Sequence, residues 1–380
     1  MDPCSLPTKP CHGASNRAAI LGFLQIQFEA NIQQSLILFK YVCKSSFSLI
    51  SHPNFANSHF DLTAATHTPR ILSIFYSPLQ FQSIDFESSD DSASSVNLNN
   101  FFIPQFGDKK FHAYIIVSCR GFIFFHCFIR LYLQNPSTGL HKQIPLSPFD
   151  SKFLTYCVRT NLYGFGYDKS RNDYLVVVLG YESTLANNVF LSHLEVFSLR
   201  DNTWKQIEGA HFPCKNATDD YSKQGVLFNG AIHWLAFRYD LYVYVIVAFN
   251  LMERKLFEIP LPDHDDFHYQ SSYCHLWVFG EFLSLCDVDY ENYTTKIWVM
   301  KEYKVRSSWN KKLVLPRPDI FPIYSTKNYD IIGTNFYKLV KYNDKGQLLG
   351  YHYYRGNLES SCVVMYTESL LSLPGDNDEV

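Results

Sequence analysis

The densest group of side chains able to bind a metal lies in one short segment, PDHDDFHY. Its candidate ligands are Asp263, His264, Asp265, Asp266 and His268. Carboxylates and imidazoles are common metal ligands, but adjacent residues rarely converge on one ion without further ligands from distant segments. The segment also follows a strand-like run that ends at Pro260. We therefore interpret it as a solvated acidic loop and predict neither a metal site nor a cofactor.

Patterns that serve nucleotide or acyl-transfer chemistry are incomplete in this sequence. The motif GFGYDK begins at Gly164, but Lys169 stands where the dinucleotide fingerprint requires a third glycine. The motif also sits between two predicted strands rather than before a helix. The GxSxG pattern of a serine hydrolase does not occur. We therefore predict a protein without catalytic residues that is not an enzyme.

Basic residues gather in KEYKVRSSWNKK, which spans 301–312 and includes Tyr303 and Trp309. Binding to nucleic acid requires a continuous basic face, but Glu302 interrupts this run and the whole chain has a formal net charge of -3. We interpret the segment as a solvated hairpin with Trp309 buried. No nucleic-acid partner is predicted.

The elements that must position these residues are mostly strands. Aromatic residues reach 17% and charged residues only 18% of the chain, a composition that favours strands. From Phe101 to about Leu373, apolar or aromatic runs alternate with turns that contain Asn, Asp, Gly or Arg, which is the pattern of hairpins. The clearest hairpins begin at Leu131, Val196, Val247 and Lys338, and looser ones begin at Phe165 and Lys296.

The hairpins recur roughly every 40–65 residues, near the spacing of propeller blades. Closing such units into a ring protects the strand edges. We therefore predict a mainly β fold, a β-propeller with irregular blades, preceded by a short α-helical segment. A β-sandwich would also contain many short strands, and that alternative stays open.

One apolar stretch, Ile115–Leu133, is long enough to be confused with a membrane span. It contains Arg120, and a central arginine costs roughly 2.5–3.5 kcal/mol on insertion. Gly121 also divides it into two strand-length pieces. No signal peptide is evident, and ten scattered cysteines are typical of reduced, mostly buried thiols. We expect a cytoplasmic or nuclear protein, or one found in both, with no membrane partner.

The segment before the strands is helical in pattern. Leu36, Phe39, Val42 and Cys43 recur at helical spacing. Pro53 should end the helix before it, and we predict another short helix over 54–59. The predicted organisation is a poorly ordered 1–30, a short helical segment at 31–65, a linker with a first strand at 66–100, and a propeller-like domain at 101–375.

A resemblance to a known family is carried by segments along the whole chain. They are LILFKYVCKSSFSLISHPNFANSHFDL from Leu36, NPSTG at Asn135, YGFGYD at Tyr163, VFSLRDNTW at Val196, GAIHWLA at Gly230, FNLMERKLFEIPLP at Phe249, IWVMKEYKVRSSW at Ile297 and YTESLLSL at Tyr366. In this order the chain resembles plant F-box proteins that carry an F-box-associated interaction domain, the F-box/kelch-like group. Residues 8–35 do not reproduce the first half of the family's F-box, and Ser46 stands where the family has Trp. The resemblance therefore implies a partial or degenerate F-box at 31–65, followed by an F-box-associated domain with a kelch-like β-propeller fold at 101–375.

The resemblance implies the substrate-recognition subunit of an SCF-type ubiquitin ligase. A Skp-type adaptor would bind the helical segment and link it to a cullin scaffold, while the β domain would hold an unknown target protein. The adaptor-binding residues implied are Leu36, Phe39, Val42, Cys43 and Lys44. The alternative is a stand-alone propeller that binds a protein or a glycan as a scaffold or decoy. A third alternative, a propeller oxidase, lacks an identifiable set of Tyr, His and Cys ligands.

Overall fold

Hairpins account for the architecture of the computed structural model. The structure describes residues 44, 48, 50, 52–63, 69–76, 79–86, 94–104, 113–127, 130–152, 161–184, 189–208, 214–216, 224–265, 267, 274–317, 320–335, 338–353 and 361–373. The chain divides into two compact units, Met1–Ile50 and Ser51–Val380. Residues 1–30 lie outside the described residues, and the described strands all belong to the second unit.

The described strands form six antiparallel sheets, here called blades 1 to 6. Blade 1 is β25 (Ser361–Tyr366), β1 (Arg70–Tyr76), β2 (Leu79–Asp85) and β3 (Ser94–Asn97); blade 2 is β4 (Ala113–Cys119), β5 (Phe122–Cys127), β6 (Arg130–Gln134) and β7 (His141–Ile144); blade 3 is β8 (Leu162–Asp168), β9 (Asp173–Thr184), β10 (Val189–Ser198) and β11 (Thr203–Gln206).

The second half of the chain forms the other three blades. Blade 4 is β12 (Cys214–Asn216), β13 (Val226–Phe228), β14 (Ala231–Arg238), β15 (Val243–Asn250) and β16 (Lys255–Pro260); blade 5 is β17 (Cys274–Phe279), β18 (Phe282–Asp289), β19 (Thr294–Met300) and β20 (Trp309–Leu315); blade 6 is β21 (Phe321–Ser325), β22 (Ile331–Thr334), β23 (Lys338–Tyr342) and β24 (Leu348–Tyr353). The described helical elements are α4 (Pro53–Thr63), α5 (Pro148–Lys152) and the 3-10 turn η2 (Arg306–Ser308).

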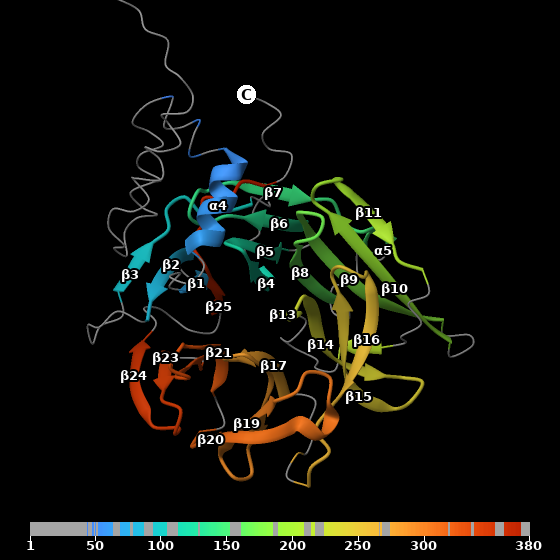
Figure 1. The fold of residues 1–380 in the computed structure, drawn as a ribbon, viewed down its shortest axis with the longest axis vertical. Helices are drawn as coiled ribbons and strands as arrows, with labels where there is room; N and C mark the ends of the chain where they lie inside the picture. The colour runs from blue at the N-terminus through green and yellow to red at the C-terminus, as the bar shows by residue number, and fades with distance from the viewer. Residues whose placement is uncertain are drawn as a thin grey trace, which may run out of the picture. The chain divides into compact units, whose positions relative to one another are not determined.

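The blades are arranged in a ring (Figure 1). Each innermost strand contacts that of the next blade, from β25 through β4, β8, β13, β17 and β21 back to β25. The ring closes because β25 pairs with β1, with Tyr366 opposite Arg70. The predicted mainly β propeller is confirmed, with six blades, and the sandwich alternative is excluded. Blade irregularity is also seen, since blade 4 has a fifth strand and β19 pairs with β20 through a register shift at Ile297.

The first blade begins before the expected domain boundary at Phe101. Strands β1, β2 and β3 lie between Arg70 and Asn97, in the range expected to hold a linker and one strand. They form the outer three strands of blade 1, and β25 supplies its inner strand. Pairing between strands from opposite ends of the domain leaves no local signal in the sequence.

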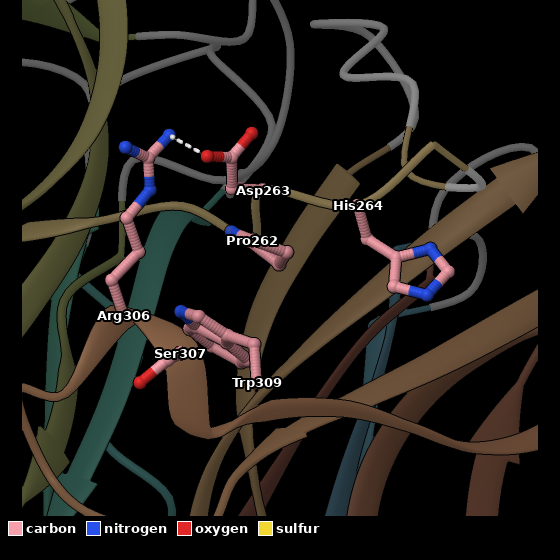
Figure 2. A pocket seen from close by; sticks show the side chains of 6 residues that line it. All are labelled: Pro262, Asp263, His264, Arg306, Ser307 and Trp309. Carbon is pink, nitrogen blue, oxygen red and sulfur yellow. Dashed lines mark ion pairs between the residues drawn. The ribbon is translucent and has the colours of Figure 1, made fainter.

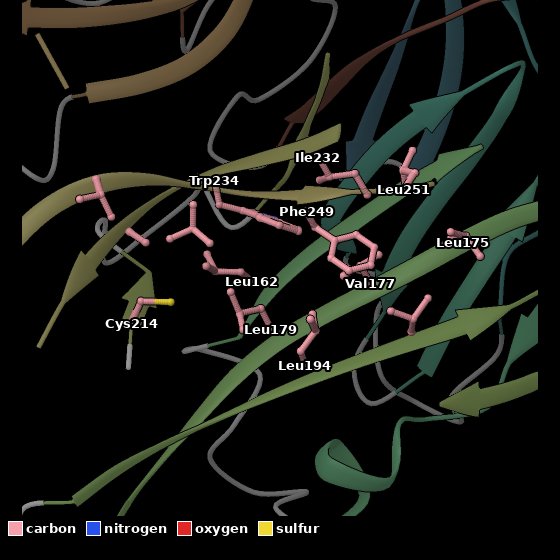
Figure 3. Packing of buried hydrophobic residues seen from close by; sticks show 14 residues of the cluster. Leu162, Leu175, Val177, Leu179, Leu194, Cys214, Ile232, Trp234, Phe249 and Leu251 are labelled. Atoms are coloured by element: carbon pink, nitrogen blue, oxygen red, sulfur yellow. The ribbon is translucent and has the colours of Figure 1, made fainter. Parts of the chain in front are cut away.

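The core lies between neighbouring blades. One cluster joins blades 3 and 4 around Trp234, which is fully buried (Figure 3). The Trp234 indole Nε1 donates a hydrogen bond of 2.8 Å to the Tyr163 carbonyl on β8. A Cβ atom at Gly164 would stand 2.7 Å from the Trp234 ring. The first glycine of GFGYDK therefore makes room for a blade-to-blade contact.

The apolar stretch Ile115–Leu133 forms parts of three strands, β4, β5 and β6, whereas the sequence predicted two pieces divided at Gly121. Gly121 lies in the turn between β4 and β5 with a φ of +82°. None of the helices described is long and apolar enough to cross a membrane.

The two ends of the ring carry different turns. Since strands alternate in direction, the first-to-second and third-to-fourth turns emerge at one end, and the second-to-third turns at the other. Contacts across blades agree: Arg171, in the β8–β9 turn, donates to the Met252 carbonyl in the β15–β16 turn at 2.9 Å. We call the first end the helix face, because α4 contacts it, and the other end the loop face.

Candidate functional site

The helix α4 is the last part of the predicted partial F-box at 31–65, and it follows the predicted adaptor-binding residues 36–44 in the chain. Pro53 suits its first position, where a missing N–H costs nothing, and the helix covers the predicted 54–59. Ala56, His59 and Phe60 are buried at i, i+3 and i+4 spacing, whereas Leu62 is exposed. One face of α4 is therefore packed against the rest of its unit.

Arg120 attaches α4 to the helix face. It lies in the β4–β5 turn with a φ of +48°, in the left-handed region. Its guanidinium donates to Asp61 Oδ1 at 3.1 Å and to Asn57 Oδ1 at 3.2 Å. The same group lies between two rings, 4.6 Å from the centroid of Phe60 and 4.3 Å from that of Tyr167. Tyr167 belongs to β8, so Arg120 links α4 to blades 2 and 3.

The segment after β25 also packs on the helix face. The buried Asn135 amide Nδ2 lies within hydrogen-bond distance of the Ser369 carbonyl, the Ser369 hydroxyl and the Leu371 carbonyl, at 3.0–3.1 Å. Asn135 opens the NPSTG turn between β6 and β7. This turn motif therefore holds residues 369–371, which follow the strand that closes the ring.

A buried carboxylate holds two further turns of this face. Asp168 is fully buried and accepts from the Ser170 hydroxyl at 2.6 Å, from Arg171 Nη1 at 2.9 Å and from Arg254 Nη2 at 3.1 Å. Burial alone would raise the pKa of Asp168, but these hydrogen bonds outweigh it and lower the pKa. Arg254 comes from the β15–β16 turn, so the network joins blades 3 and 4.

The two charged segments singled out in the sequence meet at the junction of blades 4 and 5. Together the two segments line a pocket of about 490 Å³ (Figure 2). The lining residues are Pro262, Asp263 and His264 from the first segment and Arg306, Ser307 and Trp309 from the second. Arg306 pairs with Asp263 at 3.4 Å, and both side chains are largely exposed. Trp309 is buried, as predicted, and its Nε1 donates to the Pro260 carbonyl at 3.1 Å.

The predicted acidic loop brings no metal ligands together among the residues described. His264 lies over the Trp298 ring at 5.2 Å, while Asp263 and Asp265 are exposed. No group of three potential ligands forms in that part of the chain. Asp266 and His268 lie outside the described residues.

The adaptor-binding prediction is not tested by this structure. Lys44 is exposed in a helical position. Leu36, Phe39, Val42 and Cys43 lie outside the described residues. The sequence analysis did not predict that Arg120 contacts α4. Its one unusual feature in the sequence is that it is an arginine inside an apolar run.

Comparison with known proteins identifies relatives over most of the chain. Residues 72–360 match the model of the F-box associated beta propeller domain. The chain is 27% identical to the Arabidopsis thaliana F-box/kelch-repeat protein At3g23880, covering 74% of this chain and 75% of that protein. It is 26% identical to the A. thaliana F-box protein CPR1 (75% and 70% covered) and 23% identical to F-box protein At4g22390 (75% and 71% covered).

Proposed function

The chain belongs to the F-box-associated β-propeller family, and from this premise we propose that it is the substrate-recognition subunit of an SCF-type ubiquitin ligase. The family's relatives are F-box proteins, so adaptors of the Skp type and cullin scaffolds are the partners implied for the family in general. The chain would hold a target protein and carry out no bond chemistry itself.

The attachment of α4 is the observation that carries this proposal. A receptor must hold its target at a fixed place relative to the adaptor, because ubiquitin transfer depends on orientation. Asp61, Asn57 and Phe60 all contact Arg120, so the helix that follows residues 31–52 has a defined place on the propeller. An adaptor bound to the partial F-box would thereby be joined to the blades through a helix that is itself fixed on them.

The proposed contact residues are those of the partial F-box at 31–65. Leu36, Phe39 and Val42 would supply apolar anchors from one helical face. Cys43 would complete that face, and the exposed Lys44 would lie at its rim. We also propose that the protein works in the cytoplasm, the nucleus or both, where such ligases have access to their targets.

Co-purification tests the proposal directly. The full chain is expressed together with a Skp-type adaptor, and the adaptor recovered with it is quantified. We expect stoichiometric recovery from the unmodified chain and a loss of about tenfold or more for Phe39→Ala, since truncating a central interface aromatic can cost about 2 kcal/mol. Lys44→Ala, at the rim, serves as the matched control and should lose little.

The opposite result would favour a different function. If the folded chain recovers no adaptor, the partial F-box does not bind it, and the protein acts as a stand-alone binding scaffold or decoy. If Phe39→Ala recovers as much adaptor as the unmodified chain, the proposed contact face is wrong. Circular dichroism of each variant establishes that the propeller is folded.

A further inference from the structure

Two turns on the loop face share one sequence pattern. Residues 239–242 read YDLY and residues 290–293 read YENY, each a tyrosine, an acidic residue, one further residue and a second tyrosine. Each pattern ends directly before the third strand of its blade, β15 in blade 4 and β19 in blade 5. The same pattern thus stands at the same place on neighbouring blades.

The second tyrosine of each pattern is strongly exposed. Tyr242 is 80% exposed and Tyr293 is 71% exposed, and Leu241, which precedes Tyr242, is 56% exposed. Both tyrosines have left-handed backbones, with φ of +53° and +54°. Such a conformation suits glycine or asparagine and is uncommon for a bulky residue. The tyrosine side chains therefore contribute little burial to the fold.

Tyr329, in the β21–β22 turn of the helix face, shows the contrast. It has a similar φ of +63°, but its ring lies 5.6 Å from the ring of Phe279 and packs on Gly280. Among the residues that the structure describes, Tyr242 contacts the ring of Phe237 at 6.1 Å between centroids, and its side chain stays mostly exposed. Packing explains a tyrosine on the helix face but not those on the loop face.

The charges around the two turns are mainly negative. Arg238 pairs with both Asp240 and Glu258, so that group carries excess negative charge. Glu291 is exposed in the second turn. Asp289, two residues before Glu291, pairs with Lys296, so Glu291 leaves the second turn with excess negative charge as well. This field repels nucleic-acid phosphates and attracts cations.

Exposed aromatic rings beside carboxylates form binding sites for the ammonium group of lysine and the guanidinium group of arginine. A cation over a tyrosine face is stabilised by the ring, and more so when a carboxylate lies nearby. The chain itself contains a contact between a lysine and a tyrosine ring, since Lys338 Nζ lies 4.7 Å from the Tyr351 ring centroid. Two such turns in succession fit an extended segment better than a single side chain.

We propose that the tyrosine surface formed by residues 239–242 and 290–293 binds an extended, lysine- or arginine-containing segment of the target protein. The identification of the occupant as a target rests on the proposed function. The binding itself needs no adaptor, because the surface belongs to the loop face and α4 belongs to the helix face.

Fluorescence anisotropy with the full chain tests the inference. The probe is a labelled synthetic peptide that alternates arginine and lysine with glycine and serine. We expect it to bind, and a peptide with glutamate at the basic positions not to bind. The double variant Tyr242→Asn with Tyr293→Asn should weaken binding about tenfold, since each exposed cation–π contact contributes a few-fold. Its thermal stability should stay equal or rise, because asparagine tolerates the left-handed backbone.

Two further variants make the result decisive. Tyr329→Asn changes a left-handed tyrosine on the helix face and should leave peptide affinity unchanged. Asp240→Asn with Glu291→Gln keeps the rings and should weaken binding several-fold, which covers the case in which the tyrosine variant unfolds. The inference is overturned if either folded double variant binds the peptide as tightly as the unmodified chain, or if a uridine-rich RNA binds and the peptide does not.

The adaptor experiment separates this inference from the proposed function. A chain that binds the basic peptide but recovers no adaptor supports the tyrosine surface and rejects the ligase role. A chain that recovers adaptor but binds no basic peptide supports the ligase role and rejects the tyrosine surface.

Discussion

The helix face and the loop face of the propeller use the same residue types for different purposes. On the helix face Asp168, Arg120 and Tyr329 are engaged by neighbouring blades or by α4. On the loop face Tyr242 and Tyr293 are exposed in backbones that do not favour them. The difference is the basis of our proposal that the loop face contacts a partner, whereas the helix face contributes to stability and holds α4.

This division predicts that substitutions on the helix face change stability, whereas substitutions on the loop face change binding. Three substitutions of buried or packed residues test the first half, from the largest expected effect to the smallest. The variants at Tyr242 and Tyr293 test the second half.

Removing the Asp168 carboxylate should cost most. Asp168→Ala removes the buried acceptor of three side-chain hydrogen bonds, from Ser170, Arg171 and Arg254, and hydrogen bonds to a charged group contribute about 1.5–3 kcal/mol each, so we expect a loss of about 3 kcal/mol or more. Urea unfolding should show this loss in the free energy of unfolding. The control Asp240→Asn, on the loop face, should lose less than about 1 kcal/mol. Equal losses for both variants would break the comparison.

Acid should destabilise the junction of blades 4 and 5 through His233. Burial lowers the pKa of His233 from 6.5 to about 4, and its ring pairs with the Tyr303 hydroxyl at 2.7 Å. Because the folded pKa lies below the unfolded one, the neutral ring stabilises the fold fully above pH 6.5. This stability, about 3 kcal/mol, is lost as the pH falls towards about 4.

The variant His233→Gln checks the assignment, since glutamine stays neutral and can still bond to Tyr303. Urea unfolding at pH 7 and at pH 4.5 should show a smaller loss of stability for this variant than for the unmodified chain. An unchanged pH dependence would show that other groups titrate in this range.

Removing Arg120 should have the smallest effect on stability and the clearest effect on α4. Arg120→Ala loses two hydrogen bonds and two ring contacts, and we expect a cost of about 1–2 kcal/mol. Hydrogen exchange should quicken in α4 and stay slow in blades 4 and 5. Arg200→Ala, in an exposed turn of the same face, is the control. Uniform quickening would mean that Arg120 supports the whole ring instead.

The sequence predicted the hairpins well because turn chemistry is local. Asn172 and Asn202 adopt positive φ in turns where the sequence placed hairpins, as asparagine readily does. The expected burial of cysteines is also seen for Cys119 and Cys214, where burial raises the pKa of each thiol to about 12. The turns at 239–242 and 290–293 lack such residues at their left-handed positions and were not predicted.

Contacts between distant segments were beyond sequence reasoning. Closure of the ring by β25 on β1 and the docking of Arg120 on α4 join residues with no local pattern in common. The sequence showed Arg120 only as a charge unsuited to a membrane. The pairing of Arg306 with Asp263 likewise joins two segments that the sequence could only describe separately.

Simultaneous binding tests the central claim most directly. The chain is captured on a surface through a Skp-type adaptor, and the basic peptide is then titrated over it. The account predicts the same peptide affinity as for the free chain, because α4 lies on the helix face and the proposed peptide surface lies on the loop face. Displacement of the peptide by the adaptor, or of the adaptor by the peptide, would contradict it.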